Sequence, residues 1–258
     1  MPDVPTTLAI ANQKGGVAKT TTVASIGVAL FELGERVLIV DLDPQSCLTF
    51  SLGIDPEDLD LSVYHVLLGQ KSAGDVIVPT DDGPDLLPAT IELAGAETAL
   101  LTRTGREHVL RAALEDVADD YDWVLLDCPP SLGLLTVGAL SAADQLLIPL
   151  QCETLSHRGV GQLLDTVHDV RRFTNRGLQV LGLLPTLYDG RTKHARTVLE
   201  TISETYDLPV LEPAIPKTIK FAEAPAVGRS ILATSRTHRG AQAYRELAAG
   251  MVARRDGV

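Results

Sequence analysis

The feature that most constrains the fold of this chain is a set of short runs whose residues are apolar on both faces. A strand that is covered by helices on both sides has this composition, whereas a half-exposed strand alternates apolar and polar residues. We therefore predict a buried, parallel β-sheet between two layers of helices. The five runs span residues 7–12, 36–43, 123–130, 144–151 and 178–186.

Longer segments with a helical pattern separate these runs. The alternation predicts an α/β fold with a doubly wound, mostly parallel sheet and helices on both faces, of the P-loop NTPase type. We expect a single domain over residues 1–258, because no repeat or long linker interrupts the chain and the most loop-like stretch, 79–85, is short. Helices are expected at 20–33, 61–68, 106–119, 132–142, 157–172, 192–206, 219–226 and 238–253.

The composition argues against several classes of protein. Aromatic residues make up only 4% of the chain, which disfavours stacking platforms for single-stranded nucleic acid. Cys47, Cys128 and Cys152 lie far apart without a CxxC pair, so we expect neither disulfides nor zinc, and a reducing cytoplasm. No apolar run is long enough to cross a membrane, and no basic residue precedes the first apolar stretch, so we expect no secretory leader.

The charge of the chain is distributed unevenly. The net charge is −12, which taken alone disfavours binding to nucleic acid. Residues 188–258, however, hold 11 Lys and Arg against 8 Asp and Glu, a net of +3, so the first 187 residues carry −15. This asymmetry is consistent with a local binding surface, but taken alone it favours random drift of surface charge.

The segment "IANQKGGVAKTTT", residues 10–22, lies between a predicted strand and a predicted helix. Glycines in such a loop let the backbone N–H groups face phosphate oxygens, and the positive end of the following helix points at the same place. Lys19 is placed to reach the terminal phosphates and Thr20 to bind Mg²⁺. The expected phosphate-binding residues of this loop are Gly15, Gly16, Val17, Ala18, Lys19, Thr20 and Thr21.

Two acidic motifs follow strands that are expected to end at the same edge of the sheet. "VLIVDLDPQ" places Asp41 and Asp43 at one strand end, and "WVLLDCPPS" places Asp127 at another. Ligands of parallel α/β sheets bind outside the carboxyl ends of the strands. We therefore expect these carboxylates beside the phosphates, with Asp127 close to Mg²⁺. The alternative for Asp41 and Asp43 is a turn with solvated carboxylates.

The segment "KGGVAKTT" resembles the deviant Walker A motif of the ParA/MinD family of ATPases, usually written KGGxGKT, and the two acidic motifs resemble that family's switch I and switch II. The resemblance implies ATP and Mg²⁺ as cofactors, with the metal near Thr20, Asp127 and Asp43. It implies that Lys14 reaches across a nucleotide-sandwich homodimer to bind the phosphates held by the other subunit, and that Asp43 orients the attacking water. Ala18 replaces the usual glycine, and its methyl group is expected to be tolerated if φ is negative there.

The last third of the chain resembles the Soj/ParA branch of this family, in "LYDGRTKHARTVLETI", "IPKTIKFAEAPAVGRSIL" and "SRTHRGAQAYRELA". The resemblance implies an adenine contact at Pro213 and Ile215, and it implies that Glu153 contacts nucleotide or partner subunit, although a role at the helix start is as plausible. It also implies non-specific DNA contacts at Arg191, Lys217 and Lys220. Lesser DNA-binding candidates are Lys193, Arg196, Arg229, Arg236 and Arg239.

The function implied by the resemblance is an ATP-dependent dimerising switch. In its ATP state the switch would bind non-specific double-stranded DNA, and slow ATP hydrolysis would drive chromosome or plasmid segregation. A ParB-type centromere-binding protein is the implied partner, and the expected location is the nucleoid in the cytoplasm. The last helix has a weak apolar face, so no stable membrane association is expected. The alternatives are a MinD-like membrane-cycling ATPase and a switch that positions protein cargo or regulates transcription.

Overall fold

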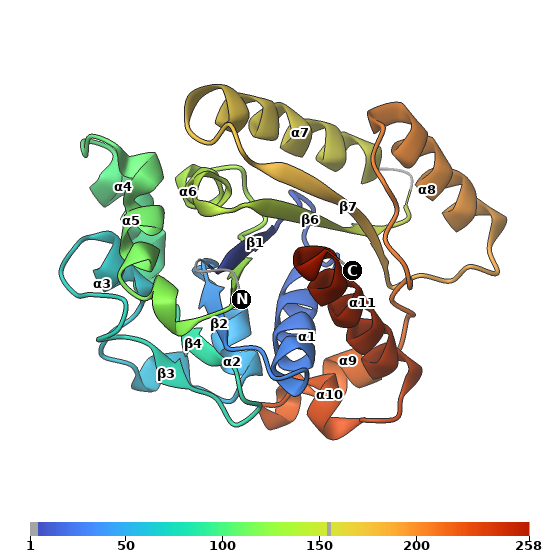
Figure 1. Ribbon diagram of the computed structural model, residues 1–258, viewed down its shortest axis with the longest axis horizontal. Helices are drawn as coiled ribbons and strands as arrows, with labels where there is room; N and C mark the ends of the chain where they lie inside the picture. The colour runs from blue at the N-terminus through green and yellow to red at the C-terminus, as the bar shows by residue number, and fades with distance from the viewer. Residues whose placement is uncertain (1–4, 154–155, 258) are drawn as a thin grey trace.

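Within the described residues, seven strands form one sheet, in the order β3-β4-β2-β5-β1-β6-β7 (Figure 1). The computed structural model describes residues 5–153 and 156–257. The expectation that no secretory leader is present rests partly on residues 1–4, which lie outside the described residues.

The five predicted runs are five neighbouring parallel strands. They are β1 (Thr6–Ile10), β2 (Val37–Asp41), β5 (Trp123–Asp127), β6 (Gln145–Gln151) and β7 (Gln179–Thr186). Each pairs in parallel with its neighbour in the order β2-β5-β1-β6-β7. The predicted α/β class with a mostly parallel sheet is confirmed.

The sequence pattern did not reveal two short strands at one edge. β4 (Asp85–Leu87) pairs in parallel with β2, and β3 (Val78–Pro79) pairs antiparallel with β4. The stretch predicted to be most loop-like is the turn that joins them. Asp82 in this turn is nearly buried: it accepts a hydrogen bond from the backbone N–H of Ser230 and forms an ion pair with Arg229.

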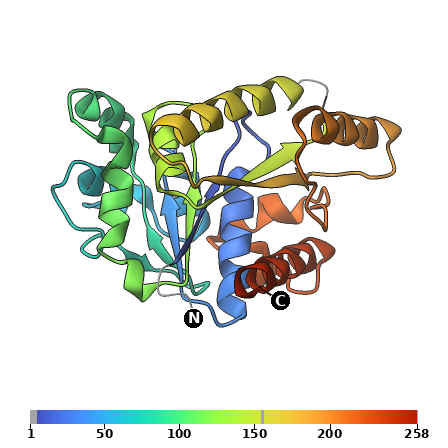
Figure 2. The same ribbon diagram turned by 45° about the horizontal axis from the view of Figure 1, so that its top comes forward.

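Helices cover both faces of the sheet (Figures 1 and 2). On one face lie α3 (Val63–Leu67), α4 (Ala96–Leu100), α5 (Val109–Glu115), α6 (Leu134–Ala142), α7 (Ser156–Phe173) and α8 (Lys193–Tyr206). On the other lie α1 (Lys19–Glu32), α2 (Cys47–Ser51), α9 (Lys220–Glu223), α10 (Ile231–Thr234) and α11 (Arg239–Asp256). Short 3₁₀ turns are η1 (Pro56–Asp58), η2 (Ile91–Gly95), η3 (Arg106–His108), η4 (Ala118–Asp120) and η5 (Pro225–Val227).

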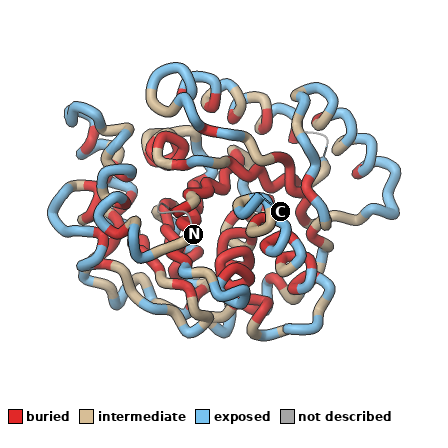
Figure 3. The backbone as a smooth tube through the Cα atoms, in the orientation of Figure 1, coloured by how far each residue is buried: buried red, intermediate tan, exposed pale blue. Residues whose placement is uncertain are grey.

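The central strands are buried on both sides, as their composition predicts (Figure 3). Along β1, Leu8 and Ile10 pack against the face that carries α1, while Ala9 and Ala11 pack against the opposite face. Because successive side chains of a strand point to opposite faces, apolar residues at every position supply two cores at once.

Two predicted helices are shorter or interrupted in the structure. The segment 106–119 is divided into η3, α5 and η4, and the segment 219–226 into α9 and η5. The helix predicted near the end of the chain is α11, which packs against α1 as a closing helix. Within the described ranges, no helix combines the length and the apolar character needed to span a membrane.

A close approach of α1 to the sheet fixes the position of the helix that follows the phosphate loop. A Cβ atom on Gly27 would lie 2.5 Å from the end of the Ile39 side chain in β2, so a larger residue would require that side chain or α1 to shift. On its other side, the hydroxyl of Thr22 lies 2.9 Å from the hydroxyl of Tyr244 in α11, and both side chains are fully buried. The two contacts hold α1 between the sheet and α11.

Tyr244→Phe is expected to lower the free energy of unfolding by about 1–2 kcal/mol, because it leaves the buried Thr22 hydroxyl without its partner. Chemical denaturation of wild type and variant measures the difference. Tyr64→Phe is the matched control, since the structure gives the Tyr64 hydroxyl no hydrogen bond within the described residues. Equal losses for the two variants would contradict a structural role for the Thr22–Tyr244 hydrogen bond.

Candidate nucleotide site

The candidate site lies at the carboxyl ends of β1, β2 and β5. The loop between β1 and α1 carries the glycines and both lysines, and Asp41 and Asp127 are directly paired residues at the ends of β2 and β5. The chain leaves β1 toward β2 on one side and later returns to β6 on its other side. This reversal of strand order is the place where parallel α/β sheets form a ligand crevice.

Two side chains that sequence reasoning missed fix the phosphate loop at its ends. The amide of buried Asn12 donates to the carbonyl oxygen of Pro149 and accepts from the N–H of Lys14. The hydroxyl of Thr186, at the end of β7, donates to the carbonyl oxygen of Val17 at 2.9 Å. Asn12 stands within the motif and could have been noticed, whereas Thr186 is 169 residues away from its partner.

The backbone at Ala18 is left-handed, with φ 64° and ψ 35°. The expectation that a methyl group is tolerated there rested on a negative φ, and that condition is not met. A non-glycine residue in this region costs roughly 1–2 kcal/mol, because Cβ approaches the following carbonyl oxygen. Gly16 in the same loop also has a positive φ of 75°. The loop therefore has the geometry of the glycine-containing motif while carrying one strained alanine.

Lys19 opens α1 and is buried. Its ammonium donates a hydrogen bond to the carbonyl oxygen of Lys14 at 3.3 Å, so the side chain folds back across the loop. Burial lowers the pKa of Lys19, and the nearby carboxylate of Asp127 opposes that shift. A cation held in this way inside the loop is positioned to meet phosphate oxygens.

Asp127 is a buried carboxylate whose two oxygens have no hydrogen-bond partner within the described residues. Burial, followed by the neighbouring charge of Asp41, raises the pKa of Asp127 well above its usual range. The Thr20 hydroxyl, which lies nearby but outside hydrogen-bonding geometry, and the Lys19 ammonium oppose the shift. An unpartnered buried carboxylate is costly for the folded state unless a cation or a donor joins it. The arrangement fits a carboxylate that holds a divalent cation.

Asp41 and Asp43 differ in what they contact. Asp41 is fully buried and accepts hydrogen bonds from the N–H of Asp43 and from both the N–H and the hydroxyl of Thr49 in α2. Burial raises the pKa of Asp41 to about 6. Asp43 is partly exposed, and its side chain accepts from the N–H of Gln45. Asp41 thus holds the segment that presents Asp43.

Lys14 points away from its own loop. Its ammonium forms an ion pair with the carboxylate of Glu153, just after β6, with 2.5 Å between Nζ and Oε2. The Lys14 side chain is 29% exposed and that of Glu153 is 54% exposed. The described structure therefore assigns Glu153 a contact within the chain, to the lysine, and the predicted contacts of Lys14 and Glu153 with nucleotide or partner subunit remain predictions.

The two residues predicted at the adenine lie in different surroundings. Pro213 lines a cavity of about 540 Å³ together with Pro185, Tyr188 and Glu246. Ile215 is only 1% exposed and packs in the core. An adenine contact remains a prediction for both residues, and Ile215 would need a local opening to make it.

Several cations predicted to bind DNA form ion pairs within the chain. Arg191 makes a two-pronged contact with Asp189, and its side chain is 91% exposed. Lys220 pairs with Glu223 in α9. The lesser candidate Arg229 pairs with nearly buried Asp82 and thus has a structural role. Exposed cations for which the structure gives no ion pair within the described residues are Lys193, Arg196, Lys217, Arg236 and Arg239.

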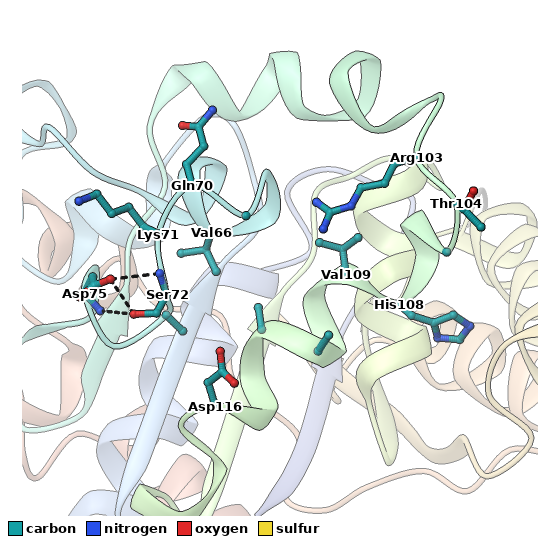
Figure 4. A pocket seen from close by; sticks show the side chains of 15 residues that line it. Val66, Gln70, Lys71, Ser72, Asp75, Arg103, Thr104, His108, Val109 and Asp116 are labelled. Atoms are coloured by element: carbon teal, nitrogen blue, oxygen red, sulfur yellow. Dashed lines mark hydrogen bonds between the residues drawn. The ribbon is translucent and has the colours of Figure 1, made fainter.

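A second hollow, of about 690 Å³, lies between the end of α3 and α5 (Figure 4). Arg103 lies across it from Lys71, and Asp75 accepts hydrogen bonds from the hydroxyl and the N–H of Ser72. Arg103 also donates to the carbonyl oxygen of Leu67. The predicted site residues are not among those that line this hollow, so it is separate from the nucleotide site.

A glycine-containing loop that opens a helix beside unpartnered strand-end carboxylates defines the class of P-loop nucleoside triphosphatases. The family model for an AAA domain matches residues 5–180. The chain is 43% identical over 242 residues to the sporulation initiation inhibitor protein Soj of Bacillus subtilis, covering 93% of this chain and 96% of Soj. It is 40% identical over 250 residues to the chromosome partitioning protein ParA of Caulobacter vibrioides, covering 96% and 94%. The chain therefore belongs to the Soj/ParA family of partition ATPases.

Solved structures of related proteins have the same fold. A structure of cobyrinic acid a,c-diamide synthase from Mycobacterium smegmatis, with bound ADP and magnesium, has 54% identity and a TM-score of 0.89, covering 98% of this chain and 96% of that one. The septum site-determining protein MinD from Pyrococcus horikoshii, with Mg-ADP, has 26% identity and a TM-score of 0.77, covering 96% of both chains.

Ala18→Gly is expected to raise the free energy of unfolding by about 1 kcal/mol, because glycine adopts the left-handed backbone without strain. Ala29→Gly, in the middle of α1, is the control and is expected to lower it by about the same amount or more. Thermal and chemical denaturation measure both. Destabilisation by both variants would contradict strain at Ala18.

Asp127→Asn is expected to stabilise the protein by about 1–3 kcal/mol at a pH above the raised pKa of Asp127, because it removes an unpartnered buried charge. The pKa of Asp127 is raised in the folded state, so the folded protein takes up a proton before the unfolded chain does as the pH falls. Wild type therefore gains stability as the pH falls through this raised pKa, and the advantage of the variant shrinks. Denaturation at pH 8, 7, 6 and 5 measures this, and a difference independent of pH would contradict the assignment.

Proposed function

We propose that this chain is an ATP-dependent dimerising switch that binds non-specific duplex DNA in its ATP state and hydrolyses ATP to drive chromosome or plasmid segregation. It would act as one domain, in the cytoplasm on the nucleoid, and answer to a ParB-type partner. The observation that carries the nucleotide part of the proposal is the buried, unpartnered carboxylate of Asp127 beside Lys19 and Thr20. Membership of the partition family supports the DNA part.

The residues present fit a magnesium nucleotide. Asp127 supplies an oxygen ligand without a competing hydrogen bond, and Thr20 supplies a hydroxyl at the start of α1. No group of three or more His, Cys, Asp or Glu in the described ranges could hold a metal ion by itself, so nucleotide oxygens would complete the coordination. Bound Mg²⁺ would neutralise phosphate charge in this site. The related M. smegmatis structures contain magnesium with ADP or an ATP analogue.

Lys19 and Lys14 would contact the phosphates of different subunits. Lys19 lies inside its own loop and would hold the terminal phosphates of the nucleotide bound there. Lys14 is directed outward, to Glu153, and is accessible at the surface. Exchange of the Glu153 carboxylate for a phosphate of a second subunit would bring Lys14 across a sandwich dimer. A positive charge from the partner stabilises the developing negative charge once water is excluded.

Asp43 is placed for the role of orienting water. It follows Asp41 by two residues, and Asp41 is held by three hydrogen bonds that fix the direction of the segment. Asp43 itself is partly exposed at the mouth of the site. A carboxylate held there can accept a hydrogen bond from a water molecule near the terminal phosphate.

The proposed DNA-binding segments lie side by side. A β-bridge joins Tyr188 to Pro216, and the N–H of Tyr188 donates to the carbonyl oxygen of Ile215. Arg191 and Lys217 each follow this bridge within three residues, so they can contact neighbouring phosphates on one duplex. Asp189 neutralises Arg191 in the described structure, and Arg191 lowers the pKa of Asp189 to about 2. DNA phosphates would replace Asp189 as the partner of Arg191.

A second candidate function is amide formation on cobyrinic acid, the activity in the name of the 54% identical M. smegmatis protein. An enzyme that draws ammonia from glutamine with a cysteine nucleophile needs a thiol of lowered pKa. In this chain burial raises the pKa of Cys47 and of Cys128, and it raises that of Cys152 to about 11. The thiols thus favour the partition switch. Formation of a diamide from cobyrinic acid, ATP and glutamine, detected by mass spectrometry, would replace the proposal.

A MinD-like membrane switch is the other alternative, since a MinD structure has the same fold. α11 packs its apolar residues Tyr244, Leu247 and Met251 inside the protein, which leaves little apolar surface for a bilayer. Flotation with anionic liposomes in the presence of ATP tests this alternative. ATP-dependent flotation without DNA binding would favour it over the partition switch.

Retention on non-specific duplex DNA is the test of the proposal, measured without nucleotide, with ADP, with ATP and with a non-hydrolysable ATP analogue. We expect retention with ATP and the analogue only. Arg191→Ala should weaken it and reduce its dependence on salt by about one phosphate contact. Asp189→Asn should strengthen it, because Arg191 is freed from its ion pair. Lys14→Ala should abolish it by preventing dimerisation.

The control is Arg111→Ala, which removes an exposed cation in α5, far along the chain from the proposed DNA segments. Its retention should match wild type. Absence of ATP-dependent retention of wild type at low salt would contradict the DNA part of the proposal. Equal behaviour of the Arg191, Asp189 and Arg111 variants would contradict the assignment of Arg191.

A further inference from the structure

Two glycines from distant parts of the chain meet backbone to backbone. Gly53 follows α2, and Gly228 follows the 3₁₀ turn η5. A Cβ atom on Gly53 would lie 2.9 Å from the carbonyl oxygen of Gly228, and a Cβ atom on Gly228 would lie 2.7 Å from the Cα atom of Gly53. Both residues have a positive φ, 86° at Gly53 and 65° at Gly228. Glycine is therefore required twice over, for the backbone conformation and for the close approach.

An ion pair fixes the chain directly after this glycine contact. Asp82, in the turn between β3 and β4, accepts hydrogen bonds from the guanidinium of Arg229 and from the N–H of Ser230, both at 2.5 Å. The Asp82 side chain is only 2% exposed. Charge-assisted hydrogen bonds of this kind are among the stronger ones in proteins. The glycine contact and the ion pair together hold the end of η5 against α2 and the β3–β4 turn.

On one side, this contact reaches the nucleotide site. α2 is held at Thr49 by two hydrogen bonds to the carboxylate of Asp41, and α2 follows the segment that presents Asp43. The chain before Gly228 also lies against the start of α1, because Thr20 lines a narrow space together with Pro225. The η5 turn therefore touches both elements that carry the proposed ligands of the phosphates and the metal.

On the other side, the contact reaches the proposed DNA-binding cations. Lys217 and Lys220 precede η5 in one short stretch, and α9 packs directly against η5. The N–H of Ala224 donates to the carbonyl oxygen of Lys220, so helical hydrogen bonding continues from α9 into η5. Between the two cations and η5, the ring of Phe221 packs edge-on against Tyr244 with 5.9 Å between ring centroids. A displacement of η5 is therefore passed to α9, since no loose linker separates them.

We propose that Gly53, Gly228 and Asp82 are positioning residues that couple two sites within one subunit. They join the nucleotide site to the DNA-binding cations of residues 217–220. A change in the segment that presents Asp43 moves α2, and the backbone contact moves η5 and α9 with it. The inference rests on the proposed function and names the path by which the nucleotide sets the DNA-binding surface. Such coupling is a free energy that both ligands share.

Gly228→Ala is the first test, because its methyl group meets the backbone of Gly53. Gly105→Ala is the matched control. Gly105 has nearly the same φ, 68°, but within the described residues a Cβ atom there meets no atom within 4 Å. The two variants therefore share the backbone strain, and only Gly228→Ala disturbs a contact.

Asp82→Asn is the second test, because it adds no atom to the glycine contact and removes the charge that holds Arg229. Its control is Asp122→Asn. Asp122 also accepts from a backbone N–H and a guanidinium, both of Arg36, but it lies just before the start of β5, away from the nucleotide site. If Gly228→Ala fails to fold, the Asp82 variant and its control decide the question.

The measurement is hydrogen–deuterium exchange of the full-length protein without DNA, with and without a non-hydrolysable ATP analogue and Mg²⁺. In wild type and both controls, the analogue should slow exchange of residues 217–223 by about fivefold or more. In Gly228→Ala and Asp82→Asn the effect should fall below about twofold, while affinity for the analogue stays within about threefold of wild type. A purely structural role would change exchange equally with and without nucleotide.

DNA affinity measured on the same proteins gives the second readout. The ratio of affinities with and without the analogue should fall by about tenfold or more in both test variants. Exchange of residues 217–223 that ignores nucleotide in wild type would overturn the proposal. So would a wild-type response in the test variants, or an equal loss in the controls. A nucleotide response without DNA retention would instead remove the DNA part of the proposed function and leave the coupling intact.

Discussion

The structure depends on one electrostatic constraint: three ionisable side chains are buried next to one another at the carboxyl edge of the sheet. Asp41 and Asp127 are paired residues of β2 and β5, and Lys19 lies close to Asp127. Asp41 is satisfied by Asp43 and Thr49, but Asp127 is not satisfied within the described residues. The fold therefore keeps a buried carboxylate without a positive partner, and the metal ion of a bound nucleotide is suited to supply one. Binding of metal and nucleotide would then also stabilise the folded state.

The residues around this cluster hold the phosphate loop and the neighbouring helices in fixed positions. Asn12 and Thr186 hold the two ends of the phosphate loop, and Asp41 holds the start of α2. α1 lies tightly against β2 through Gly27. A strained alanine at position 18 persists because these contacts determine the path of the loop independently of its local preference.

Much of the fold was predictable from the sequence, because runs that are apolar on both faces leave few alternatives to covered parallel strands. The loop, Lys19 and the strand-end position of Asp127 followed from the order of strand, loop and helix. The β3–β4 pair was not predictable, since strands of two and three residues carry no periodic signal. The sign of φ at Ala18 and the contact from Thr186 to Val17 depend on tertiary packing, which a local pattern does not contain.

The ion pair between Lys14 and Glu153 has a consequence for how steeply assembly would respond to conditions. In the proposed sandwich dimer two such pairs would open, one in each subunit, so their free energy would enter the association constant twice. A change of about 1 kcal/mol in each pair, from salt or a neighbouring charge, would alter that constant by roughly thirtyfold. Because the same ion pair occurs in both subunits of the proposed dimer, its effect on the association constant would be squared. This one surface contact would therefore make dimer formation respond steeply to salt and to neighbouring charge.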